Sequence, residues 1–165
     1  MSSPAIPLKE FDIEMVTTRN LLERVPTEKG AWKPHEKSFA LGHLAMLVAW
    51  IPGWITRTLY DPFIDLKQGG EGGGYSFQPT EKLLEIFDRN VHDARDGLVA
   101  VTGAKLDEPW SLKMGEQVLF TTPRGEVVRN HLSHLIHHRG QLTVYLRLVD
   151  VSLPKVYGPT ADERW

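Results

Sequence analysis

The sequence predicts an all-α protein, a four-helix bundle with one long crossover between its second and third helices. Three observations favour this class. Four segments repeat apolar residues at helical spacing, a glycine-rich stretch separates the second segment from the third, and the other connections are short or irregular. With 165 residues, 41% hydrophobic and 24% charged, the chain has the size and composition of a single domain, and we expect residues 1–165 to form it.

The first two predicted helices lie on either side of a loop that contains a glycine and two prolines. The first covers about residues 7–24 and is apolar along one side. The second is expected to begin near Ser38, a residue type that caps helix N-termini, and to continue to Tyr60. Because the apolar pattern resumes directly after Pro52, we expect this proline to kink the helix without ending it.

Residues 61–78 are predicted to form the flexible crossover, because the stretch GGEGGG places five glycines in six positions. The third helix is expected to begin at Pro79–Thr80 and to end just before Gly103, where a C-terminal glycine is typical. Residues 105–124 have no regular pattern and indicate an ordered loop with a brief extended piece at Val118–Phe120.

The fourth predicted helix runs from about Arg124 to Val149, and an irregular tail follows it. Four of the protein's seven histidines lie in this helix: His131, His134, His137 and His138. The apolar stripe of the helix has a three–four spacing and consists of Val128, His131, Leu135, His138, Leu142, Tyr145 and Val149. Two histidines therefore occupy core positions where leucine would be the default.

His134 and His138 form a candidate metal-binding pair. Residues four apart on a helix differ by about 40° in direction and about 6 Å in height, so the two rings can converge on one ion. His131 with His134, and His134 with His137, are competing pairs at a three-residue spacing. A lone pair of this kind also arises by chance, and hydrogen-bonded packing in the core is the alternative.

A third candidate ligand is His43, which lies in the apolar run of the second helix. A single histidine on an apolar face is more often a satisfied core residue than a ligand. If the second and fourth helices lie side by side, however, His43, His134 and His138 supply three nitrogens, and further positions stay open as in catalytic zinc sites. The chain has no cysteine, so disulfides and thiolate ligands are excluded.

Residues close to the histidines have more than one interpretation. Arg139 and Gln141, at one and three positions after His138, cannot both share its face. We favour a structural salt bridge or a dimer contact for Arg139 over substrate binding. For Tyr145 we favour core packing over the floor of a pocket or a proton donor. The five tryptophans are expected mostly in the core or at an interface, although they could also wall a pocket.

Composition excludes several classes of function. The net charge of −2, from 19 basic and 21 acidic residues, disfavours nucleic acid as a partner. The N-terminus lacks the basic and apolar regions of a signal peptide. The longest apolar stretch, residues 44–55, is too short to span a membrane and is broken by Pro52 and Gly53. We therefore expect a cytoplasmic protein with no membrane partner.

Three stretches carry a resemblance to a known family: WKPHEKSFALGHLAML (32–47), TTPRGEVVRNHLSHLIHHRGQLTVYLR (121–147) and YGPTADE (157–163). They resemble the DinB-like and YfiT-like families of bacterial metalloenzymes. The resemblance covers essentially the whole chain and is weakest through residues 61–120. It implies an up-down-down-up path of the four helices and homodimers.

The resemblance also implies a divalent metal ion, zinc or nickel, with iron and manganese as further candidates. Carried over residue by residue, it makes His43, His134 and His138 the ligands and gives no ligand role to His131 or His137. Members of the wider family include S-transferases that use bacillithiol or mycothiol and a mycothiol-dependent isomerase.

We therefore expect a metal-dependent enzyme of hydrolase or small-thiol S-transferase type that acts on a small-molecule substrate. A metal ion held by neutral imidazoles can lower the pKa of bound water toward ~7 or activate a thiol. Since the chain has no cysteine, that thiol would come from a low-molecular-weight cosubstrate. The alternatives are a non-catalytic metal- or ligand-binding protein of the stress response, and a structural dimer with a vestigial histidine cluster.

Overall fold

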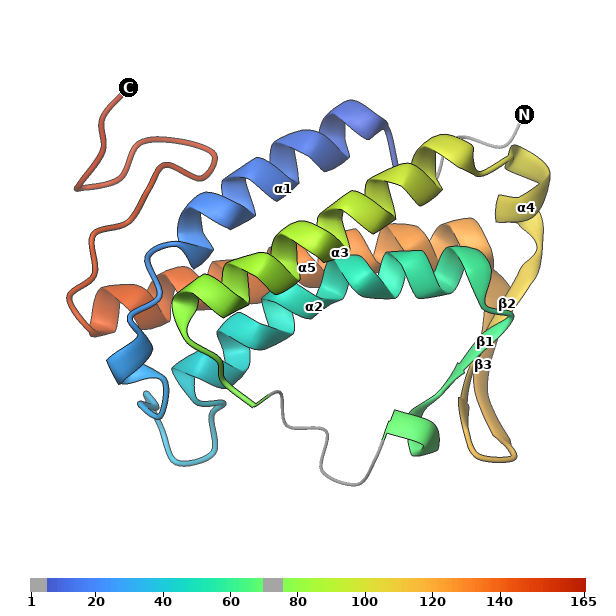
Figure 1. Ribbon diagram of the computed structural model, residues 1–165, viewed down its shortest axis with the longest axis horizontal. Coiled ribbons are helices and arrows are strands. Elements are labelled where there is room, and N and C mark those ends of the chain that lie inside the picture. Colours follow the sequence, from blue (N-terminus) through green and yellow to red (C-terminus); the bar gives the residue numbers. More distant parts are fainter. Residues whose placement is uncertain (1–5, 70–75) are drawn as a thin grey trace.

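The computed structural model describes residues 6–69 and 76–165. Four long helices pack along one another, with a small sheet at one end and the C-terminal tail at the other (Figure 1). The long helices are α1 (Leu8–Leu22), α2 (Leu41–Tyr60), α3 (Thr80–Ala100) and α5 (Arg124–Leu148). The short elements are α4 (Gly103–Asp107), the 3-10 turns η1 (Thr27–Lys29) and η2 (Leu66–Gly69), and the strands β1 (Phe63–Asp65), β2 (Pro109–Met114) and β3 (Gln117–Pro123).

Helix α2 is the centre of the core, because it packs against both α3 and α5. It is apolar on most of its surface, and 13 of its 20 residues are buried. Of the stripe of α5 that was predicted from sequence, Val128, Leu135, His138 and Leu142 are buried. Its other members are partly buried, namely His131, Tyr145 and Val149. His138 is thus part of the packed core and only 9% exposed.

Pro52 lies inside α2, and the helix continues through it as predicted. A proline has no N–H for the carbonyl four residues earlier, so this turn loses one backbone hydrogen bond. Asn90 of α3 supports the same turn, where its Nδ2 donates to the carbonyl of Ala49 at 2.9 Å. Gly53 leaves room for this contact, because a β-carbon there would lie 3.2 Å from the Asn90 amide.

The predicted N-cap at Ser38 is wrong, because α2 begins at Leu41 and Ala40 precedes it without a side-chain cap. Backbone carbonyls of the preceding loop take the place of a cap. The N–H of Leu41 donates to the carbonyl of Trp32 at 2.8 Å, and the N–H of Gly42 donates to Gly30 at 2.9 Å. The first turn therefore has partners that no local sequence signal reveals.

The predicted all-α fold class, a four-helix bundle with an up-down-down-up path, is wrong, because the chain also forms a three-stranded sheet. The predicted crossover contributes β1, which pairs in parallel with β2, and β2 pairs antiparallel with β3. Residues 105–124, predicted as a loop, contain most of α4 together with β2 and β3. The β-branched and aromatic residues of β3 favour a strand, and Gly115, with φ +63°, forms the hairpin turn with Glu116.

Two further predictions concern the connections. Gly103 does not end α3 but begins α4, and Thr102 caps α4 by accepting from the N–H of Lys105 at 3.2 Å. The glycine run predicted as flexible lies outside the described residues from position 70 to position 74. The tail after α5 has neither helix nor strand, as predicted.

No helix within residues 6–69 and 76–165 combines the length and hydropathy that crossing a bilayer requires.

Candidate metal centre

His134 and His138 lie on successive turns of α5, and their rings face each other. The two Nε2 atoms are 2.8 Å apart, and the ring centroids are separated by 4.6 Å. This is the convergence that a four-residue spacing on a helix allows. Burial lowers the pKa of His134, and the neighbouring rings of His138 and His137 lower it further, so its neutral form is favoured.

Gln141 contacts the other nitrogen of His138. Its Oε1 lies 2.7 Å from Nδ1 of His138 and, as a carbonyl oxygen, accepts the Nδ1 proton. A neutral His138 then has no proton on Nε2, and this nitrogen accepts from the Nε2–H of His134. The sequence indicated only that Arg139 and Gln141 cannot both lie on the face of His138, and the structure places Gln141 there.

His43 lies on α2, the helix that packs against α5. Its ring stacks on the ring of Phe39 with centroids 4.5 Å apart, and the Phe39 ring is 6.5 Å from that of His138. Burial lowers the pKa of His43, and the positive charge of Lys33 lowers it further. Phe39, which sequence reasoning did not assign to the site, thus contacts histidines from both helices.

The structure brings together two of the three predicted ligands. Across residues 6–69 and 76–165, no three His, Cys, Asp or Glu side chains form a group that could hold a metal ion. The two Nε2 atoms of the pair are 2.8 Å apart, a hydrogen-bond distance. Two imidazoles on a tetrahedral zinc, at about 2.05 Å each, have their nitrogens about 3.3 Å apart, so the two rings would have to separate slightly to hold one ion. A centre with three histidines therefore requires these side chains to rearrange.

His131 packs against α2 and forms a hydrogen bond with it. Its Nε2 lies 2.9 Å from Oγ1 of Thr58 on α2, and its ring packs against Trp54 at 5.8 Å. Burial, together with the nearby ring of His134, lowers its pKa to about 4. Trp54 also packs against His134, with centroids 5.5 Å apart, and so covers one side of the pair. His137 is exposed, and its ring meets that of His138 edge-on at 5.0 Å.

Arg139 forms a buried salt bridge and does not face the histidines. Its Nη2 lies 2.6 Å from Oε2 of Glu14 on α1 and donates to the hydroxyl of Tyr157 in the tail at 2.7 Å. Its Nη1 donates to the carbonyl of Glu14 and the hydroxyl of Thr18, both at 3.1 Å. This matches the structural salt bridge that the sequence favoured. The guanidinium fastens α1 and the tail to α5.

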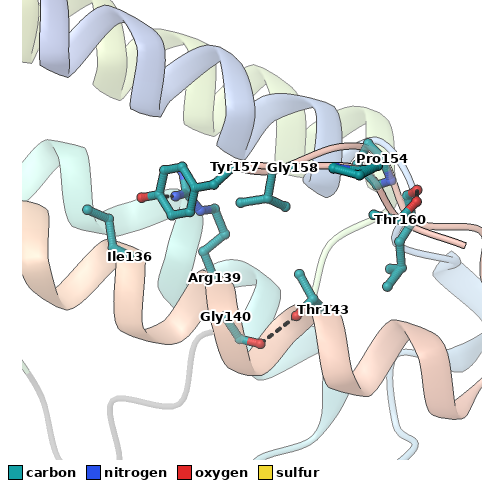
Figure 2. Close-up of a pocket in the computed structure, with 11 residues that line it drawn as sticks. Ile136, Arg139, Gly140, Thr143, Pro154, Tyr157, Gly158 and Thr160 are labelled. Carbon is teal, nitrogen blue, oxygen red and sulfur yellow. Dashed lines mark hydrogen bonds between the residues drawn. The ribbon is translucent and has the colours of Figure 1, made fainter. Parts of the chain in front are cut away.

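A pocket of about 420 Å³ lies between α5 and the tail (Figure 2). It is lined on α5 by Ile136, Arg139, Gly140 and Thr143, which point away from the face of His138 because each residue turns about 100° around the helix. Its hydroxyl groups have partners within the chain. Thr143 donates to the carbonyl of Gly140 at 2.6 Å, and Thr160 donates to that of Leu153 at 2.9 Å. The pocket is thus separate from the histidine pair.

The tryptophans are distributed over the whole molecule. Trp32 packs edge-on against Tyr145 at 5.8 Å, and both rings are partly buried against the core. Trp50 and Trp54 are also partly buried there, as the sequence indicated for most of the five. Trp110 is buried in β2, and Trp165 is 88% exposed. Trp54 packs directly on the candidate ligand His134.

Comparison with known proteins places the chain in a family. The model of the DinB family matches residues 7–164. The uncharacterized protein YrdA of Bacillus subtilis (strain 168) is 26% identical over 163 residues, covering 96% of this chain and 89% of YrdA.

Two crystal structures resemble this one. The DinB-like protein YjoA from Bacillus subtilis has a TM-score of 0.70 and 18% identity, over 90% of this chain and 95% of YjoA. A DinB-like protein from Bacillus cereus ATCC 10987 has a TM-score of 0.69 and 21% identity, over 91% and 95% of the two chains. At these identities the likeness shows that the fold is shared, and it carries no statement about activity. The family match extends over nearly the whole sequence and confirms the resemblance found in the sequence motifs, so the chain belongs to the DinB family.

Proposed function

We propose that the chain binds a divalent metal ion, zinc or nickel, through His43, His134 and His138 and acts as a metal-dependent enzyme. The observation that carries this proposal is the 2.8 Å approach between an imidazole nitrogen of His134 and one of His138, which lies in the core-facing stripe of α5. Packing alone would be satisfied by leucine at position 138, whereas a buried imidazole needs partners for both nitrogens. The orientation of His138 by Gln141 matches how proteins hold histidine ligands.

The reaction would be hydrolysis or the transfer of a small thiol. When bound, the ion would lower the pKa of a water molecule or of a thiol. His134 and His138 would hold it from α5, and His43 would complete the site from α2. Phe39 and Trp54 contact these histidines and would limit the access of water from their sides. The chain has no cysteine, so a thiol would arrive as a cosubstrate.

We further propose that the protein acts as a homodimer in the cytoplasm on a small-molecule substrate. Support comes from Val144 and Leu148, which are 57% and 56% exposed and lie four residues apart on α5. Paired apolar residues on a helix surface are suited to contact with a second copy. Sedimentation velocity should give twice the mass of one chain, and Val144→Glu should reduce that mass to one chain. A monomeric wild type would contradict the dimer.

The metal is tested first, on protein made without an affinity tag. The metal-free protein is titrated with Zn²⁺ and with Ni²⁺ in a calorimeter. We expect one equivalent to bind the wild type and binding to be lost in His134→Ala and His138→Ala. His137→Ala is the matched control, because His137 lies on the same helix but is exposed. Wild-type protein without stoichiometric binding would overturn the proposal.

The reaction class is tested with a panel of electrophiles, esters and amides, each with and without low-molecular-weight thiols. Turnover that needs both metal and thiol identifies a thiol transferase, and turnover that needs metal alone identifies a hydrolase. Metal binding without turnover would favour the non-catalytic metal-binding protein. The His138→Ala variant should be inactive on every substrate that the wild type converts.

A further inference from the structure

We infer that Gln141 is a positioning residue that fixes the tautomer of His138 and thereby prepares its Nε2 for the metal. For its consequence at the metal, this inference rests on the function proposed above. The contact itself does not, because it is present between two side chains of the chain, 2.7 Å from Oε1 to Nδ1. A proton on Nδ1 leaves Nε2 of a neutral imidazole with a free electron pair, which is the form that coordinates a metal.

The other groups around His138 do not impose this tautomer. Phe39 and His137 approach its ring at 6.5 and 5.0 Å between centroids, and Phe39 offers no hydrogen-bond acceptor in its ring plane. The remaining close polar contact within the described residues is Nε2 of His134. That nitrogen can either donate to or accept from His138, so it adapts to the tautomer and does not set it. Gln141 differs from these groups because its Oε1 is a carbonyl oxygen, which can only accept a hydrogen bond.

The position of Gln141 on α5 explains how it reaches His138. Residues three apart on a helix are neighbours on one face. Gln141 is exposed, so its amide could turn to solvent, yet it contacts the more buried ring. Because the side chain is exposed, changing it removes a hydrogen bond without opening a cavity in the core.

The two candidate ligands on α5 therefore differ in whether their Nε2 carries a proton. His138 presents a bare Nε2, whereas His134 donates its Nε2 proton to it in the metal-free protein. Binding a metal requires His134 to release this proton or to move it to Nδ1. Without Gln141, His138 would also populate the form with the proton on Nε2, which free histidine favours, and in that form His134 would accept this proton. Metal binding would then lose the stabilisation that Gln141 gives to the Nδ1–H form of His138, the form that it requires.

The test uses full-length, untagged, metal-free protein labelled with ¹⁵N in its histidines, at a pH where the rings are neutral. Long-range ¹H–¹⁵N spectra distinguish the Nδ1–H from the Nε2–H form, and the His138→Ala variant identifies the signals of His138. We expect the Nδ1–H form in the wild type, a shift toward Nε2–H in Gln141→Ala, and the Nδ1–H form again in Gln141→Glu, which keeps an acceptor. Gln117→Ala, at an exposed position on β3, is the matched control.

Calorimetry with Zn²⁺ supplies the second measurement. Loss of a hydrogen-bond partner of a metal-binding histidine costs about 10–100-fold in affinity. We expect a loss of this size in Gln141→Ala, recovery in Gln141→Glu and no change in Gln117→Ala. An unchanged tautomer in Gln141→Ala would overturn the inference, and so would an unchanged Zn²⁺ affinity.

If the wild type binds no zinc, the proposed function fails and the tautomer alone decides this inference. In that case, an Nδ1–H form that is lost in Gln141→Ala and kept in Gln141→Glu still supports the assignment of Gln141. Identical spectra of His138 in all three proteins would overturn it.

Discussion

The histidines of α5 differ in their hydrogen-bond partners and in their pKa values. His131 donates to or accepts from the hydroxyl of Thr58, away from the nitrogens of His134 and His138. Its pKa of about 4 means that it stays neutral under conditions in which a free histidine begins to take up protons. A spacing of three residues in the sequence made it a competing ligand. Only the position of Thr58 on another helix shows that its Nε2 already has a partner.

We predict that His131 makes the protein less stable in acid. Its pKa in the folded state, about 4, lies below the ordinary value of 6.5, so the unfolded chain takes up the proton first as the pH falls. The stability that the neutral ring contributes is complete above pH 6.5 and is lost as the pH falls toward 4. The loss reaches about 3 kcal/mol at pH 4.

The measurement is urea unfolding of metal-free wild type and His131→Gln at several pH values between 7 and 4. His43 and His134 titrate in both proteins, so the difference between the two curves isolates His131. Between pH 7 and pH 4, the wild type should lose about 3 kcal/mol more unfolding free energy than His131→Gln. Parallel curves would show that His131 does not have the depressed pKa.

We predict that Arg139→Met strongly destabilises the fold. Arg139 is 1% exposed, and its removal would leave the carboxylate of Glu14 buried without its cation. Breaking a buried pair in this way costs about 3–5 kcal/mol, and the double variant Glu14→Gln/Arg139→Met should recover part of this cost. Arg95→Met is the control, because the pair of Arg95 with Asp12 is exposed and worth about 1 kcal/mol or less. Similar losses of unfolding free energy in the two arginine variants would contradict this account.

At the level of elements, the start of α2 depends on a contact across the chain. The ring of Phe77, which precedes α3, lies against Gly30 and Gly42 so closely that a β-carbon at either position would overlap it. At position 42 the overlap includes Cβ of Phe77, at 2.6 Å, which cannot move without its backbone. From the sequence, Gly30 was only a signal of a loop and Gly42 was not singled out, because the packing that requires both glycines comes from Phe77, far along the chain.

We predict opposite effects for two glycine-to-alanine substitutions within helices. Gly42→Ala should destabilise the protein by about 1–3 kcal/mol, because the new methyl group overlaps Phe77. Gly140→Ala should stabilise it by about 1 kcal/mol, because a β-carbon there meets nothing within 4 Å and alanine favours a helix. Thermal unfolding of both variants provides the measurement. A stabilised Gly42→Ala would contradict the packing of Phe77.

The long helices could be predicted from sequence because their signal is local. Each repeats apolar residues over several turns, and the observed bounds of α1, α3 and α5 fall within a few residues of the predicted ones. The hairpin was missed for the opposite reason. Its strands are short, its two-residue turn depends on the backbone of Gly115, and β1 joins β2 from about 50 residues earlier in the chain.

At the scale of the whole molecule, the helices bring the predicted ligands to the same pair of elements but do not assemble all three. The pair on α5 could be predicted because four residues of helix fix its geometry. The position of His43 could not, since it depends on the ring of Phe39, which precedes α2 and stacks on it. The sheet and α4 lie at the other end of the molecule from the tail (Figure 1).

We propose above that His43, His134 and His138 together hold one divalent ion. X-ray absorption at the zinc edge of the untagged, zinc-loaded protein counts the imidazoles bound to the metal. We expect three imidazoles in the wild type and two in His43→Ala. A wild-type spectrum without imidazole ligands, or one that stays the same in His43→Ala, would contradict it.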